Sequence, residues 1–247
     1  MTNDVQILNN GYPMPAVGLG VYKIADEQME EVVRTALDAG YRAFDTAYFY
    51  GNEKALGSAL KHSNVERDEL FITSKLWNDY QGYDQTIEYF NKSLDNLGLD
   101  YLDLFLIHWP CENDQLYIES YKALEHLYEE GKIKAIGVCN FKIHHLEKLM
   151  KETKITPQVN QIELHPYFNQ QDVQDFCDEH DIKVTAWMPL MRNKGLLDDP
   201  VITDIAHRYD KTPAQIVLRW HLAHNRIIIP KSQTPKRIKE NFDIFDF

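Results

Sequence analysis

The sequence predicts a (β/α)8 barrel, a ring of eight parallel strands with a helix after each strand. Helical patterns and short apolar runs alternate along all 247 residues. Eight runs have strand character: AVGLGVY, YRAFDTA, LFITSKLW, YLDLFLIHW, IKAIGVCN, PQVNQIEL, IKVTAWMP and RIIIPKS. Several are almost continuous in Val, Ile, Leu and Phe, as strands buried on both faces are. An open, doubly wound sheet is the alternative, because alternation alone does not distinguish an open sheet from a closed one.

The spacing of the runs favours the barrel. Residues near the ends of runs two to eight follow one another at gaps of 30, 33, 32, 21, 26 and 44 positions: Asp45, Lys75, His108, Asn140, Gln161, Trp187 and Lys231. A strand–helix unit needs about 30 residues. The longest gap holds VITDIAHRYDKTPAQIVLRWHLAHN, which predicts an additional helix in two pieces.

The connecting elements follow from local patterns. VQIL-NNG-YPMPA predicts a β-hairpin with an Asn-Gly turn that covers the N-terminal end of the barrel. Apolar residues at helical spacing predict helices over residues 29–37, 87–97, 117–128 and 173–180, the first three ending at a glycine. Because no Gly/Pro/Ser-rich linker or block of charge interrupts the chain, we expect one domain over residues 1–247.

Composition limits the partners. The chain has 26 Lys and Arg against 38 Asp and Glu, a net charge of −12, which argues against nucleic acid and anionic membranes as partners. The start, MTNDVQILNNG, lacks the basic and apolar regions of a secretory signal. Cys111, Cys139 and Cys177 have no CxxC spacing and are expected to be reduced thiols. We therefore expect a cytoplasmic protein, monomeric by default, that acts on a small molecule.

Candidate catalytic residues follow the predicted strands. Asp45, Lys75 and His108 lie where three successive runs end, and Tyr50 follows Asp45 in the next loop. In barrels these strand ends form one face, where active sites lie. These types suit protonation of a carbonyl oxygen during its reduction: Tyr50 as acid, Lys75 lowering its pKa by about 1–3 units, Asp45 holding Lys75, and His108 orienting the substrate.

Longer motifs identify the chain as similar to the aldo-keto reductases. They are GYRAFDTAYFYGNEKALG, ITSKLW, LFLIHWP, IGVCNF, QIELHP and IPKS followed by Arg237 and Asn241. The pattern covers the whole chain and is most like the bacterial 2,5-diketo-D-gluconate reductase and prostaglandin F synthase branch. The resemblance implies NADPH-dependent reduction of small aldehydes, ketoaldehydes or diketo-sugar acids, with Tyr50 as proton donor.

The same resemblance implies the NADP(H) contacts. Cys139, Asn140 and Gln161 would hydrogen-bond the nicotinamide carboxamide, and Trp187 would stack on the ring. Lys231, Ser232 and Arg237 would surround the 2′-phosphate, and Asn241 would contact the adenine. The residues themselves support the phosphate site, because cations at a helix start oppose the helix dipole unless an anion binds there.

Three departures from the family pattern bear on the site. Cys139 stands where Ser is usual, and a thiol is the weaker donor. Tyr22 replaces a common Trp. The printed sequence ends at FDIFDF, where the family is expected to continue with a helix and a tail that covers the substrate. A wide pocket with broad specificity is therefore expected, with aromatic walls: Tyr22, Phe49, Trp77 and Trp109.

Two other functions remain open at this stage. Lys75 at a strand end is also compatible with a Schiff-base lysine of an aldolase-like enzyme. A non-catalytic NADP-binding regulatory barrel is the second alternative. No metal site is expected, since His144, His145 and Glu147 lie on a helical stretch as solvated residues.

Overall fold

Eight parallel strands form the centre of the computed structural model, which describes residues 5–247. No secretory signal is expected in MTNDVQILNNG, and residues 1–4 of that stretch lie outside the described residues. In chain order the strands are β3 (Gly18–Gly20), β4 (Ala43–Asp45), β5 (Phe71–Leu76), β6 (Leu102–Ile107), β7 (Ile133–Cys139), β8 (Val159–Glu163), β9 (Lys183–Trp187) and β10 (Ile227–Ile228). Each predicted apolar run contains one of them. The eight predicted strands are confirmed.

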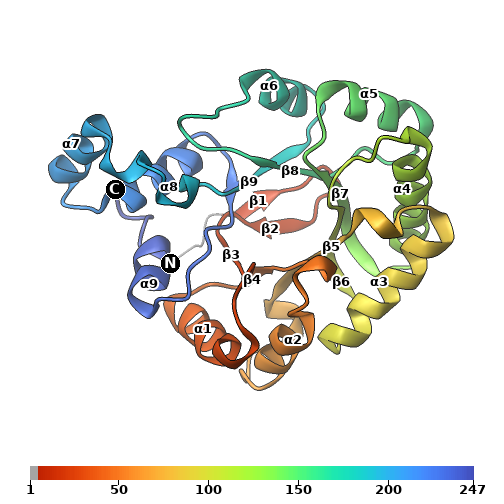
Figure 1. Ribbon diagram of the computed structural model, residues 1–247, viewed down its shortest axis with the longest axis horizontal. Helices are drawn as coiled ribbons and strands as arrows, with labels where there is room; N and C mark the ends of the chain where they lie inside the picture. The colour runs from red at the N-terminus through yellow and green to blue at the C-terminus, as the bar shows by residue number, and fades with distance from the viewer. Residues whose placement is uncertain (1–4) are drawn as a thin grey trace.

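The ring is closed, which decides between the barrel and the open sheet. Each strand pairs in parallel with its neighbour in the sequence, from β3 to β10. The two ends then meet: Val17 forms a parallel bridge with Ile228, whose N–H donates to the carbonyl of Ala16 at 2.9 Å. Figure 1 looks into this ring and shows the helices around it.

The helices surround the strands in the predicted order. They are α1 (Asp26–Ala39), α2 (Glu53–Lys61), α3 (Tyr83–Leu97), α4 (Asp114–Glu129), α5 (Ile143–Glu152), α6 (Gln171–Glu179), α7 (Pro200–Tyr209), α8 (Pro213–Ala223) and α9 (Pro235–Phe242). Short 3₁₀ turns are η1 (Tyr48–Tyr50), η2 (Arg67–Glu69), η3 (Asn78–Tyr80), η4 (Met191–Asn193) and η5 (Leu196–Asp198). The additional helix of the longest gap is α7, which packs on α8 outside the ring (Figure 1).

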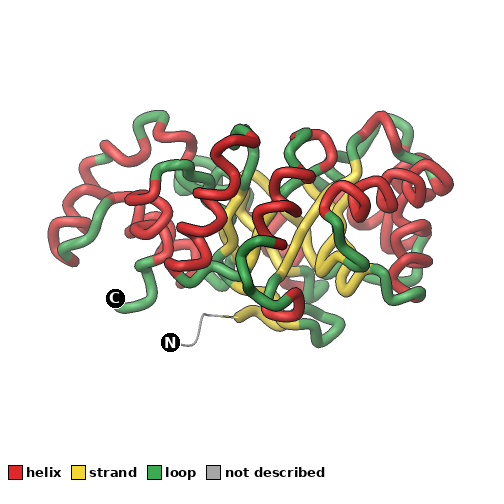
Figure 2. The backbone as a smooth tube through the Cα atoms, turned by 90° about the horizontal axis from the view of Figure 1, so that it is seen from below, coloured by secondary structure: helices red, strands yellow, loops and turns green. Residues whose placement is uncertain are grey.

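The hairpin lies across the end of the barrel where the strands begin. It consists of β1 (Val5–Ile7) and β2 (Pro13–Pro15), which pair antiparallel, and Figure 2 shows it at the lower edge of the molecule. The Tyr12 hydroxyl donates to Asp103 at 2.7 Å, near the start of β6. The turn contains the predicted Asn-Gly pair, Asn10 and Gly11. The Gly11 N–H donates to the Leu8 carbonyl at 2.8 Å and Gly11 has φ 84°, which is a three-residue loop with one left-handed position.

Two apolar layers hold the barrel and leave its other end to polar groups. Inside the ring, side chains of six strands and of the hairpin pack together: Leu8, Met14, Ala43, Phe71, Leu104, Leu106, Ala135, Cys139, Val159 and Ile227. A larger layer fills the space between strands and helices. The hairpin closes the N-terminal end, so the C-terminal ends of the strands are the face left for a site.

Candidate active site

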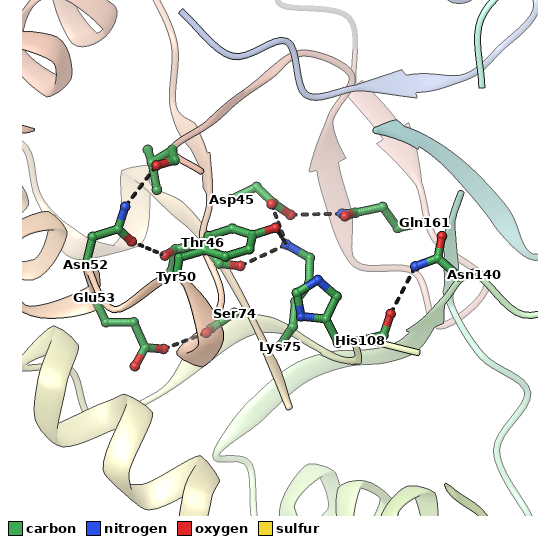
Figure 3. Close-up of polar contacts among 11 residues, drawn as sticks. Asp45, Thr46, Tyr50, Asn52, Glu53, Ser74, Lys75, His108, Asn140 and Gln161 are labelled. Carbon is green, nitrogen blue, oxygen red and sulfur yellow. Dashed lines mark hydrogen bonds and ion pairs between the residues drawn. The ribbon is translucent and has the colours of Figure 1, made fainter. Parts of the chain in front are cut away.

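The four predicted catalytic side chains meet at the C-terminal end of the barrel. Asp45 ends β4, Lys75 is the fifth residue of β5, and His108 directly follows β6. Tyr50 ends η1, the turn that follows β4. Figure 3 shows them grouped around the Lys75 amine. The structure therefore brings the predicted set together from three neighbouring strands.

Lys75 lies at the centre of the group and is fully buried. Its Nζ donates to Asp45 Oδ1 at 2.5 Å, to the Thr46 carbonyl at 2.8 Å and to the Tyr50 hydroxyl at 3.5 Å. An ammonium has three donors, and all three are used. Burial alone would lower the pKa of Lys75. Asp45 and Tyr50, which face its amine, raise the pKa by more, so that overall it lies above its usual range. Lys75 is a fixed positive charge.

Tyr50 is a weaker acid in the free protein than the sequence predicts. Burial raises its pKa to about 12, although the charge of Lys75 acts to lower it. The expected direction of the Lys75 effect is confirmed, but the expected net lowering is wrong. The reason is desolvation, which disfavours a phenolate more than one cation at 3.5 Å favours it. The Tyr50 hydroxyl consequently keeps its proton at neutral pH.

His108 is neutral in this environment. Burial and the charge of Lys75 lower its pKa to about 3. Its ring lies edge-on to Tyr50, with centroids 5.7 Å apart, and edge-on to Trp77 at 5.2 Å. Within residues 5–247 its buried Nδ1 has no hydrogen-bond partner. A neutral imidazole carries one N–H, which can be donated to a substrate oxygen beside Tyr50.

The predicted cofactor residues on β7, β8 and β9 form hydrogen bonds next to this group. Gln161 Nε2 donates to the second oxygen of Asp45 at 2.8 Å. Asn140 Nδ2 donates to the His108 carbonyl at 3.0 Å, and Asn140 Oδ1 accepts from Trp187 Nε1 at 2.8 Å. Cys139 is 1% exposed, and burial raises the pKa of its thiol. Gln161, Asn140 and Trp187 therefore continue the hydrogen-bonded group from Asp45 and His108 toward β8 and β9, whereas Cys139 packs in the apolar layer inside the ring.

A basic segment follows β10 on the same side. Lys231 is exposed, and burial of part of its chain lowers the pKa of its amine. Arg237 is exposed at the first turn of α9, where two cations occur without an acidic residue, and Thr234 gives no side-chain cap. In the described chain Arg237 has no ion pair, and the buried Asn241 has no side-chain hydrogen bond. Ser232 Oγ accepts from the Thr234 N–H at 3.1 Å.

The four aromatic side chains predicted for the substrate pocket make ring contacts with the catalytic group, with one another or with Trp187. Tyr22 packs on Tyr50 with centroids 4.8 Å apart. Phe49 stacks on Trp77 at 3.8 Å, and Trp109 lies 6.4 Å from Trp187. Phe49 is 50% exposed and Trp109 40% exposed, so the aromatic wall is open to solvent.

Sequence reasoning missed the residues behind the catalytic group. Thr46, Asn52, Glu53 and Ser74 are all buried and are joined by hydrogen bonds to the segment that carries Tyr50 and to β5. The available signal was the pair Asn52–Glu53, which follows Tyr50 and Gly51 within the motif GYRAFDTAYFYGNEKALG.

Comparison with known proteins agrees with the family resemblance of the sequence motifs. Residues 16–247 match the model of the aldo/keto reductase family. The chain belongs to this family. Glyoxal reductase of Bacillus subtilis (strain 168) is 50% identical over 245 residues, which are 99% of this chain and 88% of that protein. Methylglyoxal reductase DkgA of Escherichia coli (strain K12) is 49% identical over 241 residues, 97% of this chain and 87% of that protein.

A solved structure supports the cofactor of this aldo/keto reductase. A variant of Gox0644 in complex with NADPH is 43% identical and superimposes with a TM-score of 0.95, over 100% of this chain and 89% of that one. The aldo/keto reductase described here is an NADP(H)-dependent oxidoreductase that acts on carbonyl compounds. Its residues fit the cofactor, because within residues 5–247 Arg237 offers a guanidinium without an ion pair at the start of α9, where an anion is favoured, and Asn241 offers an amide without a hydrogen bond in the last turn of the same helix.

Among residues 5–247, no helix is long and apolar enough to span a membrane. The same part of the chain contains no group of three or more His, Cys, Asp or Glu side chains arranged to hold a metal ion. His144 and Glu147 are exposed on α5, as predicted. His145 is not solvated as predicted: it is half-buried with its ring against Tyr117 and Phe141, and burial lowers the pKa of its imidazole.

Proposed function

We propose that this aldo/keto reductase reduces the carbonyl of small aldehydes and ketoaldehydes, with Tyr50 as the proton donor. One observation carries the proposal. The Tyr50 hydroxyl lies 3.5 Å from the buried, charged amine of Lys75 and beside neutral His108, at the open end of the barrel. An acid, a fixed cation and a neutral donor around one position suit a carbonyl oxygen that gains negative charge.

Tyr50 is suited to give its proton only as that charge develops. Burial keeps the hydroxyl protonated at neutral pH. When the proton leaves Tyr50 Oη, the phenolate faces the Lys75 ammonium, which is held by Asp45. The stabilisation is therefore greatest in the transition state, where it raises kcat. His108 donates its single N–H to the same substrate oxygen and orients it.

The residues for NADP(H) are proposed from position and chemistry. Lys231, Ser232 and Arg237 would hold the 2′-phosphate, where a cation and a guanidinium fork match a dianion. Asn241 would contact the adenine, Trp187 would stack on the nicotinamide, and the side chains Cys139, Asn140 and Gln161 would bind its carboxamide. When bound, NADPH supplies the hydrogen and the electron pair that the carbonyl carbon receives.

The proposed substrate pocket favours a small, neutral carbonyl compound. Its proposed walls are Tyr22, Phe49, Trp77 and Trp109, and none of these carries charge. The relatives named glyoxal reductase and methylglyoxal reductase point to two-carbonyl aldehydes of this size. A diketo-sugar acid belongs to the same reaction class, but its carboxylate has no cationic partner among these four residues.

A substrate panel tests the proposal. NADPH consumption would be followed by absorbance with methylglyoxal, an aromatic aldehyde, 2,5-diketo-D-gluconate and an aliphatic ketone, each repeated with NADH. We expect the highest kcat/KM with methylglyoxal and NADPH and little turnover with NADH. Preference for the sugar acid would overturn the proposed substrate class, and absence of turnover with every carbonyl would overturn the proposed reaction.

The geometry does not favour the Schiff-base alternative. That chemistry needs an uncharged lysine with a free lone pair. Lys75 instead donates all three N–H groups and faces Asp45, which keeps it protonated. Borohydride with a carbonyl substrate is expected to leave Lys75 unmodified, because its amine forms no imine.

A further inference from the structure

Glu53 is a buried carboxylate that the proposed reaction does not use. It is the first residue of α2 and is 2% exposed. Ser74 Oγ donates to Oε1 at 2.6 Å, and Asn96 Nδ2 donates to Oε2 at 3.0 Å. Within residues 5–247 no cation forms an ion pair with it. A buried anion is costly, and here neutral donors and a helix N-terminus are what stabilise it.

The Ser74 contact reaches the residue next to Lys75. Successive side chains of a strand point to opposite faces. On β5, Ser74 therefore points outward to α2, while Lys75 points inward to Asp45, as Figure 3 shows. The hydrogen bond from Ser74 to Glu53 joins the backbone that carries Lys75 to the start of α2. That start lies three residues after Tyr50.

Asn52 connects the two ends of the segment that carries Tyr50, residues 46–52. Its Oδ1 accepts from Thr46 Oγ1 at 3.0 Å, and its Nδ2 donates to the Val21 carbonyl at 2.8 Å. The Thr46 carbonyl in turn accepts from Lys75. Residues 46–52, which carry Tyr50, are thus held at both ends. Val21 also precedes Tyr22, which packs on the Tyr50 ring.

We propose that Asn52 and Glu53 are positioning residues that set the distance between the Tyr50 hydroxyl and the Lys75 amine, Asn52 through Thr46 and Glu53 through Ser74. This inference rests on the proposed role of Tyr50. The Tyr50–Lys75 contact, at 3.5 Å, is the longest of the three that Lys75 makes. Within residues 5–247 the Tyr50 hydroxyl has no other hydrogen bond, so its distance from Lys75 depends on the packing of its ring against Tyr22 and His108 and on the two backbone segments that these hydrogen bonds hold.

Matched variants separate positioning from stability. Ser74→Ala and Asn96→Ala each remove one hydrogen bond to the same carboxylate, but only Ser74 adjoins Lys75. We expect Ser74→Ala to lower kcat about tenfold, because small displacements of reacting groups are costly, with NADPH affinity unchanged. Asn96→Ala is expected to keep kcat within about twofold at a similar loss of melting temperature. Thr46→Val, which keeps the side-chain shape and removes the bond to Asn52, is expected to act like Ser74→Ala and serves if that variant does not fold.

The Tyr50→Phe background distinguishes the two proposals. If Ser74 acts through Tyr50, Ser74→Ala causes no further loss of kcat when Tyr50 is already Phe. If Ser74→Ala, Thr46→Val and Asn96→Ala have equal kcat and Tyr50→Phe is inactive, the positioning inference is refuted and the proposed role of Tyr50 stands. A Tyr50→Phe variant that keeps its activity would refute the proposed function together with the inference that rests on it.

Discussion

Replacing Tyr50 with Phe removes one oxygen atom and very little packing. The ring keeps its contact with Tyr22 at 4.8 Å and its edge-on contact with His108 at 5.7 Å. Lys75 loses its longest hydrogen bond, at 3.5 Å, and keeps those to Asp45 and Thr46. Since a typical hydrogen bond contributes about 0.5–1.5 kcal/mol, the free energy of unfolding should fall by about 1 kcal/mol or less.

The effect of Tyr50→Phe on catalysis should be much larger. General acid catalysis contributes roughly 10²–10⁴-fold, and each tenfold change corresponds to about 1.4 kcal/mol in the barrier. We therefore expect kcat to fall by at least about two decades, or about 3–5 kcal/mol. The assay is NADPH consumption with methylglyoxal at saturating cofactor. NADPH binding, measured by quenching of tryptophan fluorescence, should not change. A variant with more than about a tenth of the wild-type kcat would refute Tyr50 as the proton donor.

Four further predictions concern Arg237, His108 and Tyr12. Arg237→Ala should raise KM for NADPH far more than for NADH, and similar increases for both would exclude Arg237 from the 2′-phosphate site. Because the pKa of His108 is lowered from 6.5 to about 3, the pH profile of kcat/KM should show no His108 step near pH 6.5. As pH falls from 6.5 toward 3, only the unfolded chain gains the His108 proton, which lowers the free energy of unfolding of the wild type. His108→Asn lacks this group, so its free energy of unfolding should decrease less over the same pH range. Equal decreases in the two proteins would contradict the lowered pKa. Tyr12→Phe should lower the free energy of unfolding by about 1.5–3 kcal/mol in urea, through loss of the 2.7 Å bond to buried Asp103, without changing kcat, and reduced turnover would show that the hairpin affects the site.

Much of the fold could be predicted from the sequence because its signals are local. Continuous apolar runs mark strands buried on both faces, and helical spacing followed by glycine marks helix ends. Gly40 and Gly98 follow α1 and α3 in left-handed backbone, as predicted. Asp45, Lys75 and His108 could be placed on one face because parallel strands end at the same side of a barrel. That rule needs only the order of the strands.

The tertiary structure decided what depends on distance and burial. It showed that Gln161, 116 residues from Asp45 in the chain, hydrogen-bonds its carboxylate, and that Glu53 contacts Ser74 behind Lys75. It also reversed the predicted net shift of the Tyr50 pKa, since desolvation is set by all the groups packed around the hydroxyl. The sequence by itself determined which elements form and which residue types end them. How closely those side chains approach, and how much water they keep, follows only from the packing of elements that are distant along the chain.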